Sequence, residues 1–280
     1  MNDSTKIIFF DIDGTVWDWS EVIPDSTRTA IKELVKQGHI PVICSGRARS
    51  HLLYNDLIDM GFKDMVAACG GYVRADEKVL YDNHIEEPLI KKIIDLSIEC
   101  RMPIVLEGPE YHWISEKGFE KDDFVDRMYQ NMGNRAIKGL RFENGMLVNK
   151  IAGDILNCSD YDKFKTGLKD DFDFIEHGLA LNVNQNPGLE DNEIRGVYEI
   201  VPKGTHKAFG IRKYCEYRSV NPKDTIAIGD SANDIEMLET VGYGVAMGNA
   251  VGKIRDIANY ITDDIHEDGL YNAMKYLKLI

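Results

Sequence analysis

Two aspartates placed two positions apart are the residues of this 280-residue chain best suited to chemistry. Asp11 and Asp13 come directly after the apolar run Ile7–Phe10, which is typical of a fully buried strand. Side chains at positions i and i+2 of an extended backbone project to the same side, so the two carboxylates should converge at the end of the strand. Two like charges this close are costly unless a cation or a proton intervenes. The pair therefore indicates a divalent metal site, or one aspartate that carries a proton while the other has a different role.

Two further groups of polar residues lie where predicted strands meet predicted helices. Ser45 and Gly46, in the sequence Ser45-Gly46-Arg47, follow a second apolar run. A hydroxyl, a glycine and backbone amides at such a junction form a natural cradle for a phosphate. Lys207 lies in the first turn of a helix expected over 205–217. From there it can place an ammonium group beside the carboxylates.

A fourth group follows the strand expected at 225–228. It contains Asp230, Asn233 and Asp234, and its carboxylates suit a hard cation that prefers oxygen ligands. Each of the four groups alone is weak evidence. Together they place carboxylates, a hydroxyl, a lysine and more carboxylates at the carboxyl ends of strands, where open α/β sheets bind their ligands.

Strands and helices alternate at both ends of the chain, and this alternation predicts an α/β fold with a parallel, doubly wound sheet. After the first strand, the elements expected near the N-terminus are strands at 40–44 and 65–68 and helices over 25–38 and 48–60. The elements expected near the C-terminus are strands at 197–201, 225–228 and 244–247 and helices over 205–217, 233–241 and 251–258.

The middle of the chain lacks this strict alternation and has frequent turn-forming residues. The elements expected there are helices at 88–100, 121–131 and 161–169 and short strands near 104–106, 150–155 and 179–183. We therefore expect one discontinuous core formed by residues 1–82 and 199–280, with an inserted α+β domain of residues 83–198.

Composition narrows the classes of function. The net charge is −14 and no cluster of lysine and arginine relieves it, so we expect no nucleic-acid partner. The five cysteines are scattered without a C-x-x-C pair, and the seven histidines show no metal-ligand spacing. Since the sequence shows no signal peptide and no long apolar run, we expect a cytoplasmic protein with reduced thiols and no membrane partner.

The four groups, in this order, resemble the motifs of the haloacid dehalogenase (HAD) superfamily phosphatases, in particular the Cof-like subfamily with an α/β cap of type IIB. The resemblance covers essentially the whole chain. It implies a Rossmann-like core, a substrate-specificity cap inserted between the second and third motifs, and a Mg²⁺-dependent phosphohydrolase. By position, Asp11 matches the family's nucleophile and Asp13 its general acid and base.

The same matching implies roles for the other groups. Ser45 and Gly46 match the phosphate-binding position of the second motif, and Lys207 matches the lysine that steadies the nucleophile and the phosphate. Asn233 matches a residue that supports the phosphate. One departure is Cys69, which stands before Gly70 where the family often carries Asn-Gly, so a polar substrate contact from that position is not expected.

The metal ligands implied by the resemblance are Asp11, Asp13 through its backbone carbonyl, and Asp230. Asp234 lies about one helical turn further on. We expect it to support the site through a metal-bound water or through Lys207.

The mechanism implied is hydrolysis of a small phosphate ester. Asp11 attacks phosphorus and forms an aspartyl phosphate, while Asp13 protonates the leaving group and later accepts a proton from water. Sugar phosphates, flavin mononucleotide and pyridoxal phosphate are all plausible substrates by family analogy. Two alternatives stay open: a phosphomutase or phosphotransferase on sugar phosphates, and a non-catalytic, phosphate-responsive binding protein.

Overall fold

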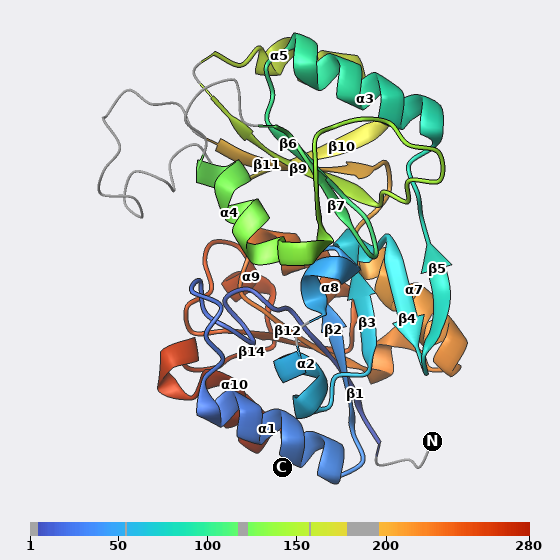
Figure 1. The fold of residues 1–280 in the computed structure, drawn as a ribbon. Helices are drawn as coiled ribbons and strands as arrows, with labels where there is room; N and C mark the ends of the chain where they lie inside the picture. Colours follow the sequence, from blue (N-terminus) through green and yellow to red (C-terminus); the bar gives the residue numbers. More distant parts are fainter. Residues whose placement is uncertain (1–4, 54, 117–122, 157, 178–195) are drawn as a thin grey trace. The chain divides into compact units, whose positions relative to one another are not determined.

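The computed structural model describes residues 5–53, 55–116, 123–156, 158–177 and 196–280. The chain divides into two compact units, each built around one β-sheet (Figure 1). The first unit comprises residues 1–47, 52–82 and 206–280, and the second comprises residues 48–51 and 83–205.

The first unit contains an eight-stranded sheet in the order β14-β13-β12-β1-β2-β3-β4-β5. Its strands are β1 Ile7–Phe10, β2 Ile40–Cys44, β3 Asp64–Ala67, β4 Tyr72–Ala75, β5 Lys78–Asp82, β12 Ile226–Gly229, β13 Tyr243–Ala246 and β14 Tyr260–Ile261. Neighbouring strands from β14 to β3 are parallel, whereas β3, β4 and β5 pair antiparallel. Strand β1 therefore has a parallel neighbour on each side.

Helices cover both faces of this sheet. They are α1 Asp25–Lys36, α2 Asn55–Met60, α7 Lys207–Arg218, α8 Ile235–Thr240, α9 Ile254–Ile257 and α10 Gly269–Tyr276. Alternate residues of β1 enter separate cores: Ile8 and Phe10 pack with α1, α2 and α10, whereas Ile7 and Phe9 pack with α7, α8 and α9. Because β1 is buried on both faces, its sequence is an unbroken apolar run rather than an alternating one.

The second unit contains a six-stranded sheet in the order β10-β11-β9-β6-β7-β8. Its strands are β6 Ile104–Glu107, β7 His112–Ile114, β8 Ala136–Lys138, β9 Lys150–Ile155, β10 Phe172–His177 and β11 Gly196–Pro202, and its helices are α3 Glu87–Glu99, α4 Asp123–Met132 and α5 Tyr161–Leu168. Helices α3 and α5 pack on one face of this sheet, and α4 packs on the other (Figure 1).

The α/β fold and the doubly wound parallel sheet predicted from the sequence are confirmed. The strand expected at 197–201 also forms, but its assignment to the first sheet is wrong. It is β11, which pairs antiparallel with β9 and β10 in the second sheet. Its residues alternate between buried and half-buried positions, as expected for an antiparallel strand with one solvated face. Accordingly, the first unit resumes at His206 rather than at residue 199.

One further expectation needs correction, and one feature was not predicted. The helix expected over 48–60 is interrupted, and the structure has a 3₁₀ turn at Arg49–Leu52 followed by α2. Residues 48–51 belong to the second unit, where the Ser50 hydroxyl donates to the Gly108 carbonyl, so tertiary contacts override the helical periodicity. The antiparallel hairpin of β4 and β5 was not expected at all. The strand expected at 179–183 lies outside the described residues.

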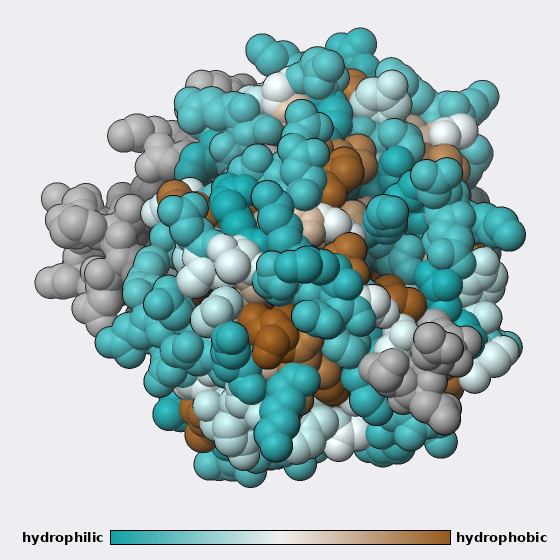
Figure 2. All heavy atoms as spheres, turned by 90° about the horizontal axis from the view of Figure 1, so that it is seen from below, coloured by the Kyte–Doolittle hydropathy of each residue, from teal (hydrophilic) through white to brown (hydrophobic). Residues whose placement is uncertain are grey.

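The face of the molecule seen in Figure 2 is mainly hydrophilic, and hydrophobic residues form only small patches on it. Among the described residues, no helix combines the length and the apolar character that crossing a membrane requires.

Candidate active site

The carboxyl ends of β1, β2 and β12 bring the first candidate residues together. The backbone amide of Asp11 donates to the Ile228 carbonyl at 2.9 Å, and that of Ser45 donates to the Val66 carbonyl at 2.9 Å, so both residues continue the hydrogen-bonding ladder of the sheet. Their side chains are buried, as is that of Asp230 directly after β12. The parallel sheet thus positions a nucleophile candidate and a metal-ligand candidate at the ends of two adjacent strands.

Lys207 connects this strand edge to helix α7. Its ammonium donates to Asp11 Oδ1 at 2.6 Å and to Asp234 Oδ1 at 2.5 Å, and it approaches Asn233 Oδ1 at 3.5 Å. Lys207 begins the helix, and the His206 ring before it caps the helix by accepting from the Phe209 amide. The lysine is only 2% exposed, so its position is fixed by these ion pairs rather than by solvent.

Asp234 organises the loop after β12. Its Oδ2 accepts hydrogen bonds from the backbone amides of Asp230 and Ser231, each at 3.1 Å, while its Oδ1 receives Lys207. Both oxygens of this completely buried carboxylate therefore already have protein donors. This supports the expectation that Asp234 orients the loop and the lysine.

The turn after β1 is packed closely against Asp230. Gly14 has φ +76°, and a Cβ atom at this position would lie 2.3 Å from Asp230 Oδ2. The Thr15 hydroxyl donates to Asp230 Oδ1 at 3.2 Å, and the Asn249 side-chain amide donates to the Gly14 carbonyl at 2.8 Å. Glycine is needed here both for the backbone conformation and for the space.

Charge in this cluster is unbalanced. One carboxylate oxygen from each of Asp11, Asp230 and Asp234 lies within 4.8 Å of the other two, and Lys207 supplies the only ammonium that contacts the cluster among the described residues. Burial and the charge of Asp234 raise the pKa of Asp11 well above its usual value, against the opposing effect of Lys207. The same two causes raise the pKa of Asp230 to about 7. Three ionised carboxylates with one lysine leave two excess negative charges, which fits a divalent cation with oxygen ligands.

Asp13 has a different environment from Asp11. Its carboxylate accepts from Arg47 Nη2 at 2.8 Å and Nε at 2.9 Å, and from Trp17 Nε1 at 2.8 Å, while Arg47 Nη1 contacts Glu21 at 2.7 Å. Burial alone would raise the pKa of Asp13, but the charge and hydrogen bonds of Arg47 outweigh it and hold the pKa below its usual value. The two aspartates of the pair are thus pushed apart in pKa, with Asp13 ionised.

Arg47 and Trp17 were not identified as site residues from the sequence. Arg47 was visible only as the last residue of Ser45-Gly46-Arg47, and its amide donates to the Ser45 hydroxyl oxygen at 3.1 Å. An arginine two positions after a phosphate-cradle serine is the signal that could have found it. Cys69 is buried, and its thiol donates to the Gly46 carbonyl at 3.8 Å, so it braces the loop after β2.

Comparison with known proteins assigns the chain to a family. The model for the haloacid dehalogenase-like hydrolases matches residues 8–274. The chain belongs to this family. The YkrA protein of Bacillus subtilis is 31% identical over 99% of both chains, and the B. subtilis 5-amino-6-(5-phospho-D-ribitylamino)uracil phosphatase YitU is 27% identical over 98% of both. The solved structure of the HAD subclass IIB sugar phosphatase BT4131 aligns with a TM-score of 0.75 and 22% identity, covering 98% of this chain and all of that one.

This HAD-family chain is therefore a phosphatase of the Cof-like kind, and the predicted recognition is confirmed. An α/β insertion such as its second unit is consistent with the subclass IIB fold. HAD phosphatases generally use a divalent metal ion, and the cluster of Asp11, Asp230 and Asp234 offers a place for one.

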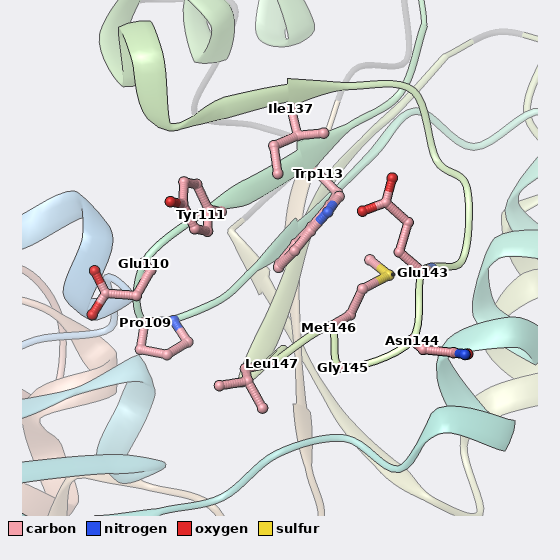
Figure 3. A pocket seen from close by; sticks show the side chains of 10 residues that line it. All are labelled: Pro109, Glu110, Tyr111, Trp113, Ile137, Glu143, Asn144, Gly145, Met146 and Leu147. Atoms are coloured by element: carbon pink, nitrogen blue, oxygen red, sulfur yellow. Dashed lines mark hydrogen bonds between the residues drawn. The ribbon is translucent and has the colours of Figure 1, made fainter.

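The second unit has a pocket of its own, with a volume of about 300 Å³ (Figure 3). Tyr111 and Trp113 stand on one side of it, and Met146 and Leu147 lie on another. Glu110 and Glu143 add carboxylates and Asn144 an amide to a lining whose other side chains are mainly apolar. Such a lining suits a small organic group with a few polar substituents.

Proposed function

We propose that the chain catalyses Mg²⁺-dependent hydrolysis of small phosphorylated metabolites through an aspartyl phosphate on Asp11. The observation that carries the proposal is the Lys207 ammonium, which bridges Asp11 and Asp234 inside a buried, acidic cluster at the carboxyl ends of parallel strands. A lysine held there favours the ionised form of Asp11, against burial and the charge of Asp234, and contacts its Oδ1, so that Oδ2 is the oxygen proposed for attack.

The nucleophile must be ionised although burial favours its neutral form. Lys207 opposes burial by a direct ion pair with Asp11 at 2.6 Å. A bound divalent cation would neutralise further charge on the carboxylates and on the substrate phosphate. We propose that Asp11, Asp230 and the backbone carbonyl of Asp13 hold this ion, with Asp234 behind them.

The phosphate would be held by Ser45, the backbone around Gly46, Asn233 and Lys207. The Ser45 hydroxyl lies at the end of β2, beside β1, and its oxygen already accepts from the Arg47 amide, so its proton is available to a phosphate oxygen. Lys207 has three donors, of which Asp11 and Asp234 take two, and the third makes only the long 3.5 Å contact with Asn233 Oδ1, which a phosphate oxygen would replace.

Asp13 would serve as the general acid and base. To donate a proton it must first take one up, and in the present arrangement Arg47 opposes this with two hydrogen bonds. We propose that Arg47 keeps Asp13 ionised in the free enzyme, and that substrate binding must weaken this pair before the leaving group is protonated. The ionised form is the one needed to accept a proton from water in the second half of the reaction.

The substrate is proposed only by class. YitU is named for a phosphorylated ribitylamino-uracil and BT4131 as a sugar phosphatase, so sugar-like phosphate esters come first, followed by flavin mononucleotide and pyridoxal phosphate. We propose that the second unit selects the leaving group. Its pocket at Trp113 is the candidate for that selection.

The test is phosphate release from a panel of phosphorylated metabolites by the wild type, Asp11→Asn and Asp59→Asn. Asp59 is exposed on α2, so its substitution is a matched control. We expect Asp11→Asn to abolish turnover with unchanged circular dichroism, because an amide is nearly isosteric but is not nucleophilic. Substantial phosphate release by Asp11→Asn would exclude the covalent mechanism. If phosphate instead appears on a second hydroxyl of a sugar phosphate, the enzyme is a mutase.

A further inference from the structure

A second cluster of metal-ligating side chains lies wholly within the second unit. His51 comes from the 3₁₀ turn Arg49–Leu52, Glu107 ends β6, and His112 begins β7. Glu107 and His112 are directly opposite partners in the antiparallel β6–β7 pair, which brings their side chains together. One ligand atom from each of the three residues lies within 4.8 Å of the other two. All three side chains are buried, with exposures of 5%, 3% and 0% respectively.

The hydrogen bonds of Ser50 fix the tautomer of His112. The Ser50 hydroxyl donates its single proton to the Gly108 carbonyl at 2.7 Å, so its oxygen must accept from His112 Nε2 at 2.6 Å. His112 therefore carries its proton on Nε2, and Nδ1 presents a lone pair. That Nδ1 atom is buried and makes no hydrogen bond within the described part of the chain. An imidazole whose other nitrogen donates to a fixed oxygen is the usual arrangement of a metal-binding histidine.

Three further buried atoms of the cluster lack a hydrogen bond. Neither ring nitrogen of His51 nor Oε2 of Glu107 makes one among the described residues, although Oε2 lies 3.9 Å from His51 Nδ1 and 3.9 Å from Lys150 Nζ. The His51 and His112 rings lie edge to face with their centroids 4.6 Å apart. Buried polar atoms normally have hydrogen-bond partners, so four such atoms without them on three neighbouring side chains point to a missing ligand.

The charges around the cluster suit a cation. Glu107 faces Lys150, whose Nζ lies 3.9 Å from Oε2. Lys150 also pairs with Glu199 at 2.5 Å. The two glutamates and the lysine sum to one negative charge, so a divalent ion would leave a single positive charge.

We propose that His51, Glu107 and His112 form a zinc-binding site in the second unit, distinct from the carboxylate cluster of the first. Two imidazoles and one carboxylate are a donor set that Zn²⁺ takes, whereas Mg²⁺ prefers oxygen ligands alone. Zinc–ligand distances of about 2.0–2.2 Å require the three side chains to close by roughly 1 Å. The ion would anchor residues 48–51, which directly follow Arg47, to the β6–β7 hairpin.

The experiment uses the full chain and the metal alone. Protein is unfolded with chelator, refolded with one equivalent of Zn²⁺ or Co²⁺ in excess Mg²⁺, and gel-filtered, and its metal content is then measured. We expect about one zinc per chain. We also expect a strong visible Co²⁺ absorption, because imidazole ligands in a four-coordinate site give stronger bands than oxygen ligands alone.

Variants separate this site from the carboxylate cluster. His51→Gln and Glu107→Gln should lose the retained zinc and the Co²⁺ absorption, whereas Asp230→Ala and His266→Gln, at an exposed histidine, should keep both. The proposal is overturned if the folded wild type retains no zinc and shows no Co²⁺ absorption. It is equally overturned if Asp230→Ala loses the metal while His51→Gln retains it. The wild-type measurement stands even if a variant fails to fold.

Discussion

Replacing Lys207 with methionine tests the electrostatics of the active site independently of any substrate. The substitution removes the ammonium that contacts Asp11 and Asp234 and keeps an apolar stem of similar length. Breaking a buried ion pair by removing one partner typically costs about 3–5 kcal/mol, because the remaining charge has no compensation. Here two carboxylates lose their partner, so the loss in free energy of unfolding at pH 8 without metal should reach at least the lower end of that range.

The penalty should depend on pH in a defined direction. Without the ammonium, the carboxylate pKa values in the folded state rise further, so the folded variant holds a proton that the unfolded chain has released. Stability then falls as pH rises from the unfolded pKa near 4 towards the folded one, and the penalty is absent at low pH. One additional proton changes stability by about 1.4 kcal/mol per pH unit. The three units from pH 8 to pH 5 could therefore offset most of the loss.

The assay is urea unfolding at pH 5 and pH 8, followed by tryptophan fluorescence in a Trp113→Phe background. The remaining tryptophans, Trp17 and Trp19, both lie in the first unit, so the fluorescence signal reports on the unfolding of that unit alone. Lys213→Met is the matched control, since Lys213 lies on the same helix in an exposed pair with Glu216, for which we expect a loss below about 1 kcal/mol. A Lys207→Met loss no larger than the control at pH 8, or an equal loss at both pH values, would refute this account of the site.

Four further predictions concern activity. Excess EDTA should abolish phosphate release and Mg²⁺ should restore it, with Ca²⁺ inhibitory because it takes more ligands at longer distances; full activity in EDTA would contradict this. Asp230→Ala should raise the Mg²⁺ concentration for half-activity more than Asp234→Ala, which should weaken Mg²⁺ binding about 10–100-fold; equal shifts in Mg²⁺ titrations, or a larger shift for Asp234→Ala, would mean that the inner and outer ligands are wrongly assigned. Because the pKa of Asp230 is about 7, its proton competes with the metal below that pH, so Mg²⁺ affinity should fall up to about tenfold per unit as pH drops from 7 to 5; a flat profile in calorimetric titrations would contradict it. Arg47→Met should move the Asp13-dependent limb of the kcat/KM profile to higher pH, whereas Arg28→Met, at an exposed pair, should leave it unchanged.

The sequence by itself determined the core of the fold and the members of the acidic cluster. Apolar runs that end in Asp11 and Asp230 can only be strands buried on both faces, and polar residues that directly follow such strands must meet at one edge of a parallel sheet. This placement is a local consequence of strand direction. Lys207 differs, because the strand before its helix, β11, belongs to the second sheet, so the folded chain rather than strand direction brings it to Asp11.

Only the tertiary structure decided the interactions between residues that lie far apart in the sequence. The sequence did not reveal that Arg47 would neutralise Asp13 rather than remain in solvent, because an arginine side chain reaches many positions and only the packed loop selects one. Nor did it assign β11 to the second sheet, because strand pairing depends on partners far along the chain.

The histidines best show the difference between what the sequence reveals and what the folded chain reveals. Their spacing along the chain carries no metal signature, and His51 lies 61 residues from His112 (112 − 51). The β6–β7 register sets Glu107 opposite His112, and the fold of residues 48–51 onto the second unit then brings His51 to them. A constellation assembled from three separate segments has no local pattern, so only the folded chain reveals it.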